Sequence, residues 1–342
     1  GSEMCIRDRY LDRVPDSAAV NEAVLCAAEY RRGQYKNFVN GVLRSFARGW
    51  HEVIIPEDDL SVRYNIPQPI IESFKKDYGE TVCIELIKAM SERAETYIRI
   101  NPLKTTVDDL IQSLPENTAE KAVLQNALCV HGTGDVTGLP GFAEGKFTVQ
   151  DASSALAVEA AGICPGNTVM DLCAAPGGKT ILAAEFAGEA GHVVSRDISE
   201  YKTDLIRENL ERMNRRNVEV QVYDATVHDP EKEKYADVVL MDVPCSGLGV
   251  MGKKRDIKYH ATPESLQSIT ELQRQIVAAG WQYVKPHGVL LYSTCTIHRG
   301  ENQEMAVWIT ENFPFVLEEE RQLLPGTDET DGFYYARLRR KA

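Results

Sequence analysis

Three residues with reactive side chains stand directly after apolar runs of the sequence. Asp242 and Cys245 belong to the tetrad DVPC, which follows the run 236–241, and Cys295 belongs to the tetrad STCT, which follows the run 289–292. Both runs are typical of buried strands of a parallel sheet, and such sheets carry their chemistry at the carboxyl ends of the strands. The sequence therefore predicts one acid and two thiols at the same edge, a set suited to covalent catalysis.

Pyrimidine methylation is one reaction that needs this set. Cytosine and uracil are poor nucleophiles at C5, but a thiolate that adds to C6 turns the ring into an enamine whose C5 attacks an electrophilic methyl group. A carboxyl group can stabilise the adduct at N3, and a base must then remove the C5 proton so that the thiol leaves. The spacing of Asp242, Cys245 and Cys295 does not tell which thiol attacks.

A third segment, DLCAAPGGKT at 171–180, follows a predicted strand and opens a predicted helix. Its Gly-Lys-Thr ending suggests a P-loop NTPase, but that motif requires Gly where Cys173 stands, and Pro176 removes a backbone donor. A tight turn without a ligand is another alternative. We favour a close approach of the backbone to a cofactor at a helix N-terminus. The residues of this loop are Cys173, Ala174, Ala175, Pro176, Gly177, Gly178 and Lys179.

Two further acids stand where a nucleoside cofactor needs them. Asp197 ends the second predicted strand about 20 residues after the glycines, the place of a carboxylate that pairs with ribose hydroxyls. Asp224 ends the third strand and could accept a hydrogen bond from an exocyclic amine. The glycine pattern is not G-x-G-x-x-G, which speaks against NAD.

The elements that must position these residues alternate from residue 147 onward. Strands are predicted at 168–172, 192–195, 218–223, 238–241, 289–292 and 333–338. Helices are predicted at 153–161, 179–186, 202–213, 263–283 and 301–312. This alternation predicts an α/β domain with a doubly wound parallel sheet.

The first 146 residues have a different character. Two amphipathic helices are expected at 18–30 and 35–48, with Phe38 and Val42 on the apolar face of the second. Two more helices hinge at Gly79, and a mixed α+β stretch follows. Its expected elements are a strand at 96–100, a helix that starts at Thr106, a strand at 128–130 and a Gly-rich loop at 132–145. We expect domains at 1–55, 56–146 and 147–342.

The composition is that of an ordinary globular protein, with 342 residues, 43% hydrophobic and 26% charged. No membrane span and no cleavable signal are expected, and a cytoplasmic monomer fits best. The eight cysteines are sparse and form no C-x-x-C pair, which argues against a zinc ribbon, so no metal site is predicted. The net charge of −13 is an objection to a nucleic-acid partner, although the sequence also contains local basic patches such as Lys253 to Arg255.

The three catalytic segments resemble those of the Sun-type (NOL/NOP/Sun) RNA cytosine-C5 methyltransferases. The resemblance rests on DLCAAPGGKT (171–180), DVPCSGLGV (242–250) and STCTI (293–297), followed by Glu301 and Asn302. AAVNEAV (18–24) and FVNGVLR (38–44) are similar to the end of the NusB-like helical domain of the bacterial small-subunit rRNA branch. We expect that this domain begins partway through and that the chain combines it with an RNA-binding α+β region and a Rossmann-like methyltransferase domain.

This resemblance implies roles for the residues. Cys295 is expected to attack C6, Cys245 to assist proton removal or product release, and Asp242 to contact the base. S-adenosylmethionine is expected to be held by the 173–179 loop together with Asp197, Asp224 and Asp242. The substrate is expected to be RNA, with 16S rRNA favoured by the NusB-like segment over tRNA. A non-catalytic RNA-binding ribosome assembly factor is the alternative from another class, against which the intact thiol pair speaks.

Basic residues near these segments are the candidates for RNA contacts. The target base must lie in a loop or be flipped out of a helix, and phosphate contacts then position it. The candidates are Arg99 and Lys104 in the middle region, and Lys253, Lys254, Arg255 and Lys258 after the second thiol segment. Arg196, which precedes Asp197, is expected to be exposed.

Overall fold

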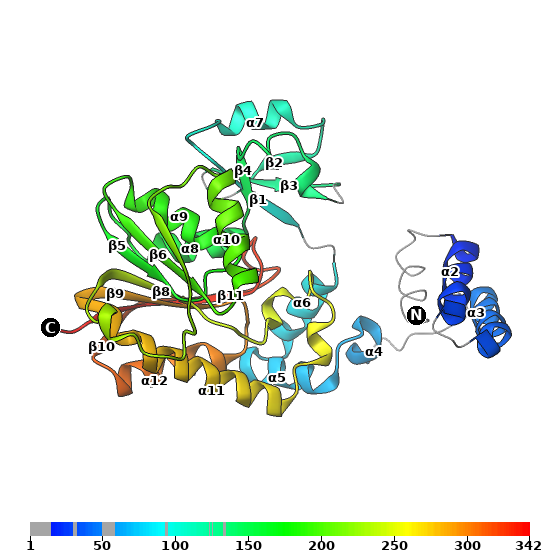
Figure 1. The fold of residues 1–342 in the computed structure, drawn as a ribbon. Helices are drawn as coiled ribbons and strands as arrows, with labels where there is room; N and C mark the ends of the chain where they lie inside the picture. Colours follow the sequence, from blue (N-terminus) through cyan, green and yellow to red (C-terminus); the bar gives the residue numbers. More distant parts are fainter. Residues whose placement is uncertain are drawn as a thin grey trace. The chain divides into compact units, whose positions relative to one another are not determined.

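The computed structural model describes residues 15–29, 33–49, 59–92, 95–122, 124, 126–132 and 135–342. The chain divides into two compact units, Gly1–Arg63 and Tyr64–Ala342, and each is described by itself (Figure 1). Helix α4 (Leu60–Tyr64) spans the boundary between them. None of the described helices is both long and apolar enough to cross a membrane.

The described part of the first unit contains the helices α2 (Asp16–Glu29) and α3 (Lys36–Gly49), with the 3₁₀ turn η1 (Gly33–Tyr35) directly before α3. Val20 and Ala23 of α2 pack against Leu43 of α3. Phe38 and Val42 were expected on the buried face of α3, but they are 69% and 50% exposed. Because each precedes a contact position by one residue, it is rotated by about 100° away from α2.

The second unit begins with two helices and a small sheet. Helices α5 (Gln68–Tyr78) and α6 (Glu80–Ser91) are joined at Gly79, whose φ of 82° confirms the predicted hinge. The four-stranded sheet has the order β2-β3-β1-β4. Its elements are β1 (Thr96–Ile100), β2 (Ala119–Lys121), β3 (Ala127–Val130) and β4 (Phe147–Val149), with α7 (Val107–Ser113) on one face. Ile98, Leu110, Leu128 and Phe147 form the core between this face and α7.

The remainder of the second unit is a seven-stranded sheet of order β10-β11-β9-β8-β5-β6-β7. Five strands run parallel, namely β5 (Thr168–Asp171), β6 (His192–Asp197), β7 (Val218–Val222), β8 (Ala236–Asp242) and β9 (Val284–Thr294). The two others, β10 (Phe315–Leu323) and β11 (Phe333–Arg340), are antiparallel additions at one edge. The predicted doubly wound sheet is therefore confirmed, with one strand more than the sequence predicted.

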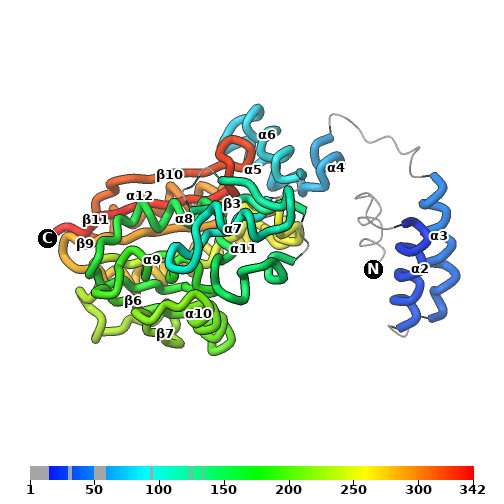
Figure 2. The backbone as a smooth tube through the Cα atoms, turned by 90° about the horizontal axis from the view of Figure 1, so that it is seen from above, coloured from blue at the N-terminus to red at the C-terminus, as the bar shows by residue number. Residues whose placement is uncertain are grey.

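Helices cover both faces of this sheet (Figures 1 and 2). One face carries α8 (Ala152–Ala160), α9 (Gly178–Ala187) and α10 (Glu200–Arg212), and the other carries α11 (Pro263–Gly280) and α12 (Gln303–Asn312). Two large apolar cores lie between the helices and the sheet. Short 3₁₀ turns occur at η3 (Val136–Gly138), η4 (Pro230–Lys232), η5 (Leu248–Val250), η6 (Ile257–Tyr259), η7 (Trp281–Tyr283) and η8 (Arg299–Glu301).

Candidate active site

The two predicted thiols meet at the carboxyl edge of the large sheet. Strands β8 and β9 are parallel neighbours, with Asp242 opposite Ser293, so the two tetrads leave the sheet side by side. The Sγ atoms of Cys245 and Cys295 lie 3.2 Å apart, and both side chains are half-buried. The structure thus brings together two sulfur atoms that lie 50 residues apart in the chain.

The surroundings make the two sulfur atoms unequal. A hydrogen bond from the Cys245 thiol lowers the pKa of Cys295, and the positive charges of Lys179 and Lys254 lower it further. The same hydrogen bond, together with burial and the nearby Glu301, raises the pKa of Cys245 well above its usual value. Cys295 is therefore the sulfur that becomes a thiolate more readily, and the thiolate is the nucleophilic form of cysteine.

Asp242 connects the thiol edge to the Gly-rich loop. Its Oδ2 lies 2.7 Å from Lys179 Nζ, and its Oδ1 accepts a 2.8 Å hydrogen bond from Ser293. Lys179 also donates to Ser154 Oγ at 2.8 Å. Burial would lower the pKa of Lys179, but the Asp242 carboxylate outweighs it and leaves that pKa raised. Lys179 is therefore an ammonium group that fixes the acid beside the two thiols.

A buried polar network supports the loop that carries Cys245. Glu301 is fully buried and accepts hydrogen bonds from Ser246 N at 2.8 Å and from Gln273 Nε2 at 2.9 Å. Gln273 also donates to Pro244 O at 2.9 Å, and the Tyr292 hydroxyl donates to Glu301 O at 2.7 Å. Gln273 was not among the site residues predicted from the sequence. The signal that could have identified it is that this polar residue shares a face of α11 with the buried Ile276 and Val277.

Two glycines bring the main chain of this loop against its neighbours. Gly249 N donates to Cys295 O at 3.2 Å, and Gly249 O accepts from Gly332 N at 3.0 Å. A Cβ atom at Gly249 would lie 2.0 Å from Gly332 O, so no side chain fits there. The loop after β8, the end of β9 and the start of β11 are therefore joined by backbone hydrogen bonds.

The Gly-rich loop has the features of a nucleoside site. Gly177 has a φ of 105° and precedes α9, whose first N–H groups have no intrahelical acceptors. Asp197 Oδ2 accepts from Ala175 N at 2.9 Å, which holds that carboxylate against the loop. Asp224 is exposed and receives two hydrogen bonds from Thr226 on Oδ1, which leaves its Oδ2 open to a ligand.

Asp171, at the start of the loop, adds a buried acceptor. Its Oδ2 accepts from Thr180 Oγ1 at 2.7 Å, while its Oδ1 is buried and has no hydrogen-bond partner among the described residues. Burial raises the pKa of Asp171 to about 7. The helix N-terminus suits an anionic group such as the carboxylate of S-adenosylmethionine, and the carboxylates at successive strand ends suit the hydroxyl groups and positive charge of the same cofactor.

Arg99, one of the six residues predicted to contact RNA, is buried. It is 6% exposed, donates to Gln150 Oε1 at 2.6 Å and forms an ion pair with Glu185 of α9. The prediction that it grips RNA was therefore wrong, because its charge is neutralised inside the protein. Arg196 was expected to be exposed, but it is 3% exposed, pairs with Asp229 at 2.5 Å and stacks on the Tyr223 ring.

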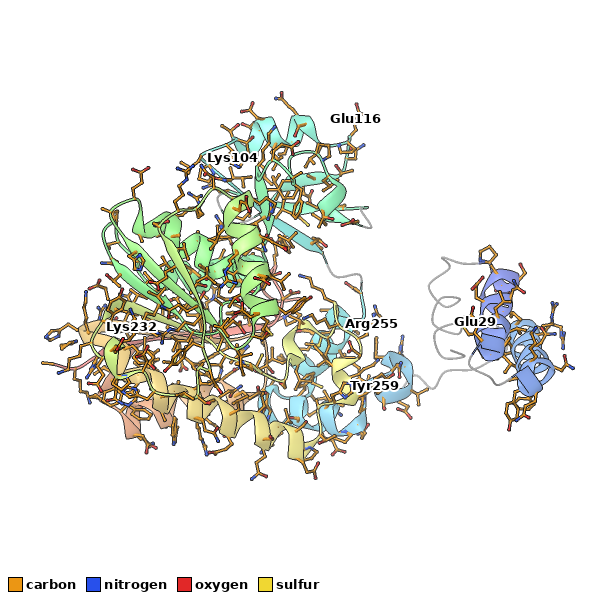
Figure 3. All side chains as sticks on the ribbon, in the orientation of Figure 1. Glu29, Lys104, Glu116, Lys232, Arg255 and Tyr259 are labelled. Atoms are coloured by element: carbon orange, nitrogen blue, oxygen red, sulfur yellow. The ribbon has the colours of Figure 1, made fainter. Side chains whose placement is uncertain are left out.

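The other basic candidates lie in two separate places (Figure 3). Lys104 is exposed and donates to Glu144 O and Arg212 O, whereas Arg255 lies beside α6 and donates to Ser91 O. Lys253 pairs with both Asp151 and Asp331, and Lys258 donates to the Asn65 carbonyl. Within the described part of the chain, Lys254 has no ion pair, and its charge acts on Cys295.

Comparison with known proteins points to one family. The model of the 16S rRNA methyltransferases RsmB/F matches residues 162–339, just over half of the chain. The NusB family model matches residues 9–48, and the model of the RsmF/B-like ferredoxin-like domain matches residues 66–137. The expected NusB-like segment and Rossmann-like methyltransferase fold are thereby confirmed.

Individual proteins agree with the family models. The probable ribosomal RNA small subunit methyltransferase B of Synechocystis sp. is 34% identical over 97% of this chain and 80% of its own length. Ribosomal RNA small subunit methyltransferase B of Serratia proteamaculans is 34% identical over 95% of this chain and 78% of its own length. A crystal structure of a methyltransferase homolog protein from Pyrococcus horikoshii superposes with a TM-score of 0.69 at 26% identity, covering 82% of this chain and 98% of that one.

Proposed function

The chain belongs to the RsmB/F family of 16S rRNA methyltransferases, and from this premise we propose that it methylates C5 of a cytosine in 16S rRNA through a covalent bond between Cys295 and C6. Its cofactor is S-adenosylmethionine, and its family acts on ribosomal RNA. The observation that carries the proposal is the 3.2 Å separation of two sulfur atoms whose pKa values are shifted in opposite directions.

The proposed reaction begins at Cys295. Its thiolate adds to C6 of the cytosine, the C5=C6 double bond opens, and the electron density moves toward C5 and N3. Asp242, held by Lys179 and Ser293, is placed to hydrogen-bond the edge of the base in the adduct. When bound, S-adenosylmethionine supplies an electrophilic methyl group to the enamine carbon.

Release requires a second group. The C5 proton must pass to a base, after which the C5=C6 double bond reforms and the Cys295–C6 bond breaks with its electron pair on sulfur. Cys245 is in contact with Cys295, and its raised pKa keeps it a thiol in the resting site, so it must first lose its own proton to solvent. Its thiolate is then the stronger base of the two. We therefore assign Cys245 to proton removal and product release.

The proposed cofactor contacts are those of the Gly-rich edge. Residues 173–179 approach the cofactor with their backbone, and Asp197 and Asp224 offer carboxylate oxygens. Asp242 belongs to the tetrad that carries Cys245, and it also contacts the cofactor loop through its ion pair with Lys179. Lys254 is the best placed of the remaining basic candidates for a phosphate near the target base, because its charge already acts on the Cys295 sulfur.

The test is methyl transfer from labelled S-adenosylmethionine to deproteinised 16S rRNA and, in parallel, to total tRNA. Wild type is expected to form 5-methylcytosine in 16S rRNA, Cys295→Ala is expected to form none, and the exposed Cys164→Ala variant should match wild type. Equal labelling by Cys295→Ala would contradict the covalent mechanism. Labelling of tRNA alone would show that the substrate is tRNA and not 16S rRNA. If a protein that binds the cofactor labels neither RNA, the result would favour a non-catalytic assembly factor.

A further inference from the structure

One face of the small sheet carries a row of polar side chains that the methylation chemistry does not use. Tyr97 of β1 and Glu120 of β2 both lie opposite Cys129 of β3. Residues opposite each other in an antiparallel pair point to the same face, and the period of two along each strand adds Glu95 and His131 to that face. The other face is the apolar core against α7. These five side chains therefore project together from the sheet.

Three of them place potential metal ligands close together. One carboxylate oxygen of Glu95, the Sγ of Cys129 and a ring nitrogen of His131 all lie within 4.8 Å of one another. The Cys129 Sγ is 3.9 Å from His131 Nδ1. This is a sulfur, nitrogen and oxygen set in a space that one ion could bridge after small side-chain adjustments.

The partners of these ligands hold them in a suitable orientation. Glu120 Oε1 lies 3.0 Å from His131 Nε2, so this carboxylate accepts the Nε2 proton and leaves the Nδ1 lone pair directed toward Cys129. Glu95 Oε2 accepts a 2.6 Å hydrogen bond from the Tyr97 hydroxyl. Metal-binding histidines commonly give their second ring N–H to a carboxylate, and metal-binding carboxylates are commonly hydrogen-bonded in turn.

The charge around the cluster favours a cation. Glu95, Cys129 and Glu120 line a pocket of about 440 Å³ together with the carboxylates of Glu92, Asp328, Glu329 and Asp331. Lys121 is the one basic residue among the described residues that line it, and its ammonium group pairs with Asp108. Lys253 neutralises Asp331 and Arg321 neutralises Asp328, which leaves the glutamates as the excess negative charge. The pocket therefore carries a net negative potential that a divalent cation would neutralise.

We propose that Glu95, Cys129 and His131 bind one Zn²⁺ ion, with Glu120 orienting the imidazole and a water molecule in the fourth position. Mg²⁺ and Ca²⁺ prefer oxygen ligands alone, whereas a Cys, His and Glu set suits Zn²⁺. The Cys129 thiol loses its proton to solvent when the metal–sulfur bond forms, and no electron is transferred. This departs from the expectation that the chain has no metal site, since ligands on paired strands need no C-x-x-C spacing.

The ion would bind at one end of the small sheet. Glu95 precedes β1, Cys129 lies in β3 and His131 follows it, so the metal would fasten one end of the small sheet. The pocket is also lined by Gly249 and Gly252 of the Cys245 loop and by the segment before β11. Tyr97 already connects these parts, because its hydroxyl lies 3.1 Å from Glu329 O as well. The bound ion would therefore lie beside a pocket that the small sheet shares with the catalytic loop.

The experiment measures metal binding in the Cys245→Ser/Cys295→Ser protein, because the catalytic thiols would otherwise bind soft metals themselves. After equilibration with Zn²⁺ and dialysis, we expect one equivalent of zinc per chain by mass spectrometry. Co²⁺ should replace it and give a thiolate-to-cobalt charge-transfer absorption. Adding Cys129→Ser should remove both signals, while adding Cys83→Ser, at another buried cysteine, should keep them.

A second set of variants keeps the test decisive if Cys129→Ser does not fold. His131 is only half-buried, so His131→Gln should keep the circular dichroism of the parent and lose the cobalt absorption. Glu120→Gln should weaken zinc binding by about 10–100-fold, the effect expected of a group that orients a ligand. Retention of the metal by His131→Gln, or no uptake of zinc by the parent protein, would overturn the proposal.

Discussion

Lys179 Nζ lies 2.7 Å from Asp242 Oδ2, so a residue at the start of α9 is bonded directly to the tetrad that carries Cys245. The two side chains are 12% and 27% exposed, which places the ion pair at the inner edge of the site. The Gly-rich loop and Asp242 are thus electrostatically coupled, and a substitution on either side should affect the other.

Replacement of Lys179 by Met should damage both stability and activity. Loss of the ammonium group leaves Asp242 partly buried with one hydrogen bond fewer, which should lower the free energy of unfolding by about 1–3 kcal/mol. Methyl transfer should fall at least about tenfold, which corresponds to about 1.4 kcal/mol of lost transition-state stabilisation. Urea unfolding and steady-state kinetics measure the two effects.

The matched control for this variant is Lys285→Met. Lys285 pairs with Asp237 at 2.8 Å, but the pair is more exposed and lies away from the two thiols. Its loss should change stability by no more than about 1 kcal/mol and leave methyl transfer unaltered. If Lys179→Met and Lys285→Met changed the free energy of unfolding and the rate of methyl transfer equally, the Lys179–Asp242 pair would contribute no more than an exposed ion pair.

Replacement of Cys245 by Ala should trap the enzyme on its product. Under the proposed mechanism Cys295 can still attack, but the base that removes the C5 proton is absent, so the thioether to C6 should persist. A protein–RNA species of increased mass should therefore appear on denaturing gels in the presence of S-adenosylmethionine. The Cys245→Ala/Cys295→Ala double variant should give none, and a Cys245→Ala protein that turns over freely would remove Cys245 from the release step.

The reactivity of Cys295 should depend on Cys245. The hydrogen bond from Cys245 lowers the pKa of Cys295, so alkylation of Cys295 by iodoacetamide should reach half of its maximal rate below the pH typical of free cysteine, about 8.5. In Cys245→Ala this donor is lost, the pKa of Cys295 rises, and the midpoint should move to higher pH. Peptide mass spectrometry at a series of pH values follows the labelled site, and an unchanged midpoint would contradict the assigned hydrogen bond.

Asp171 should make stability fall as the pH rises toward neutrality. Its pKa is raised by burial from an ordinary value near 4 to about 7, so the folded state binds its proton more tightly than the unfolded state does. The stabilising effect of that proton is complete at low pH and is lost as the pH rises through about 7. The free energy of unfolding of wild type should fall between pH 5 and pH 7.5, and in Asp171→Asn that fall should be smaller by about 1–3 kcal/mol. Urea titrations at both pH values measure it. Parallel curves for the two proteins would show that Asp171 does not titrate in this range.

Much of the large sheet could be predicted because its central strands are short apolar runs that end in polar residues. The runs before Asp171 and Asp242 are buried on both faces, so their composition alone indicates a parallel core. Strand β10 was missed because its outer residues form the acidic stretch EEE at 318–320, which does not alternate with apolar residues. Its place at the sheet edge is what permits this composition.

The charged residues were the harder part of the prediction. Arg99 was predicted to contact RNA and Arg196 to be exposed, and arginine is a residue type that is mostly exposed. Both are buried, and their partners Glu185 and Asp229 lie 86 and 33 residues further along the chain, where no local pattern connects them. The meeting of Cys245 and Cys295 could be anticipated, by contrast, because the ends of parallel strands lie on the same edge by construction.

The backbone contacts of Gly249 have a consequence for how the enzyme meets its RNA. Since main-chain hydrogen bonds join this residue to Cys295 on one side and Gly332 on the other, the spacing of the two sulfur atoms belongs to the scaffold. We expect the reactive pair to be preassembled before any nucleotide arrives. Under the proposed mechanism, the free energy of RNA binding can then act on unstacking and extruding the target base.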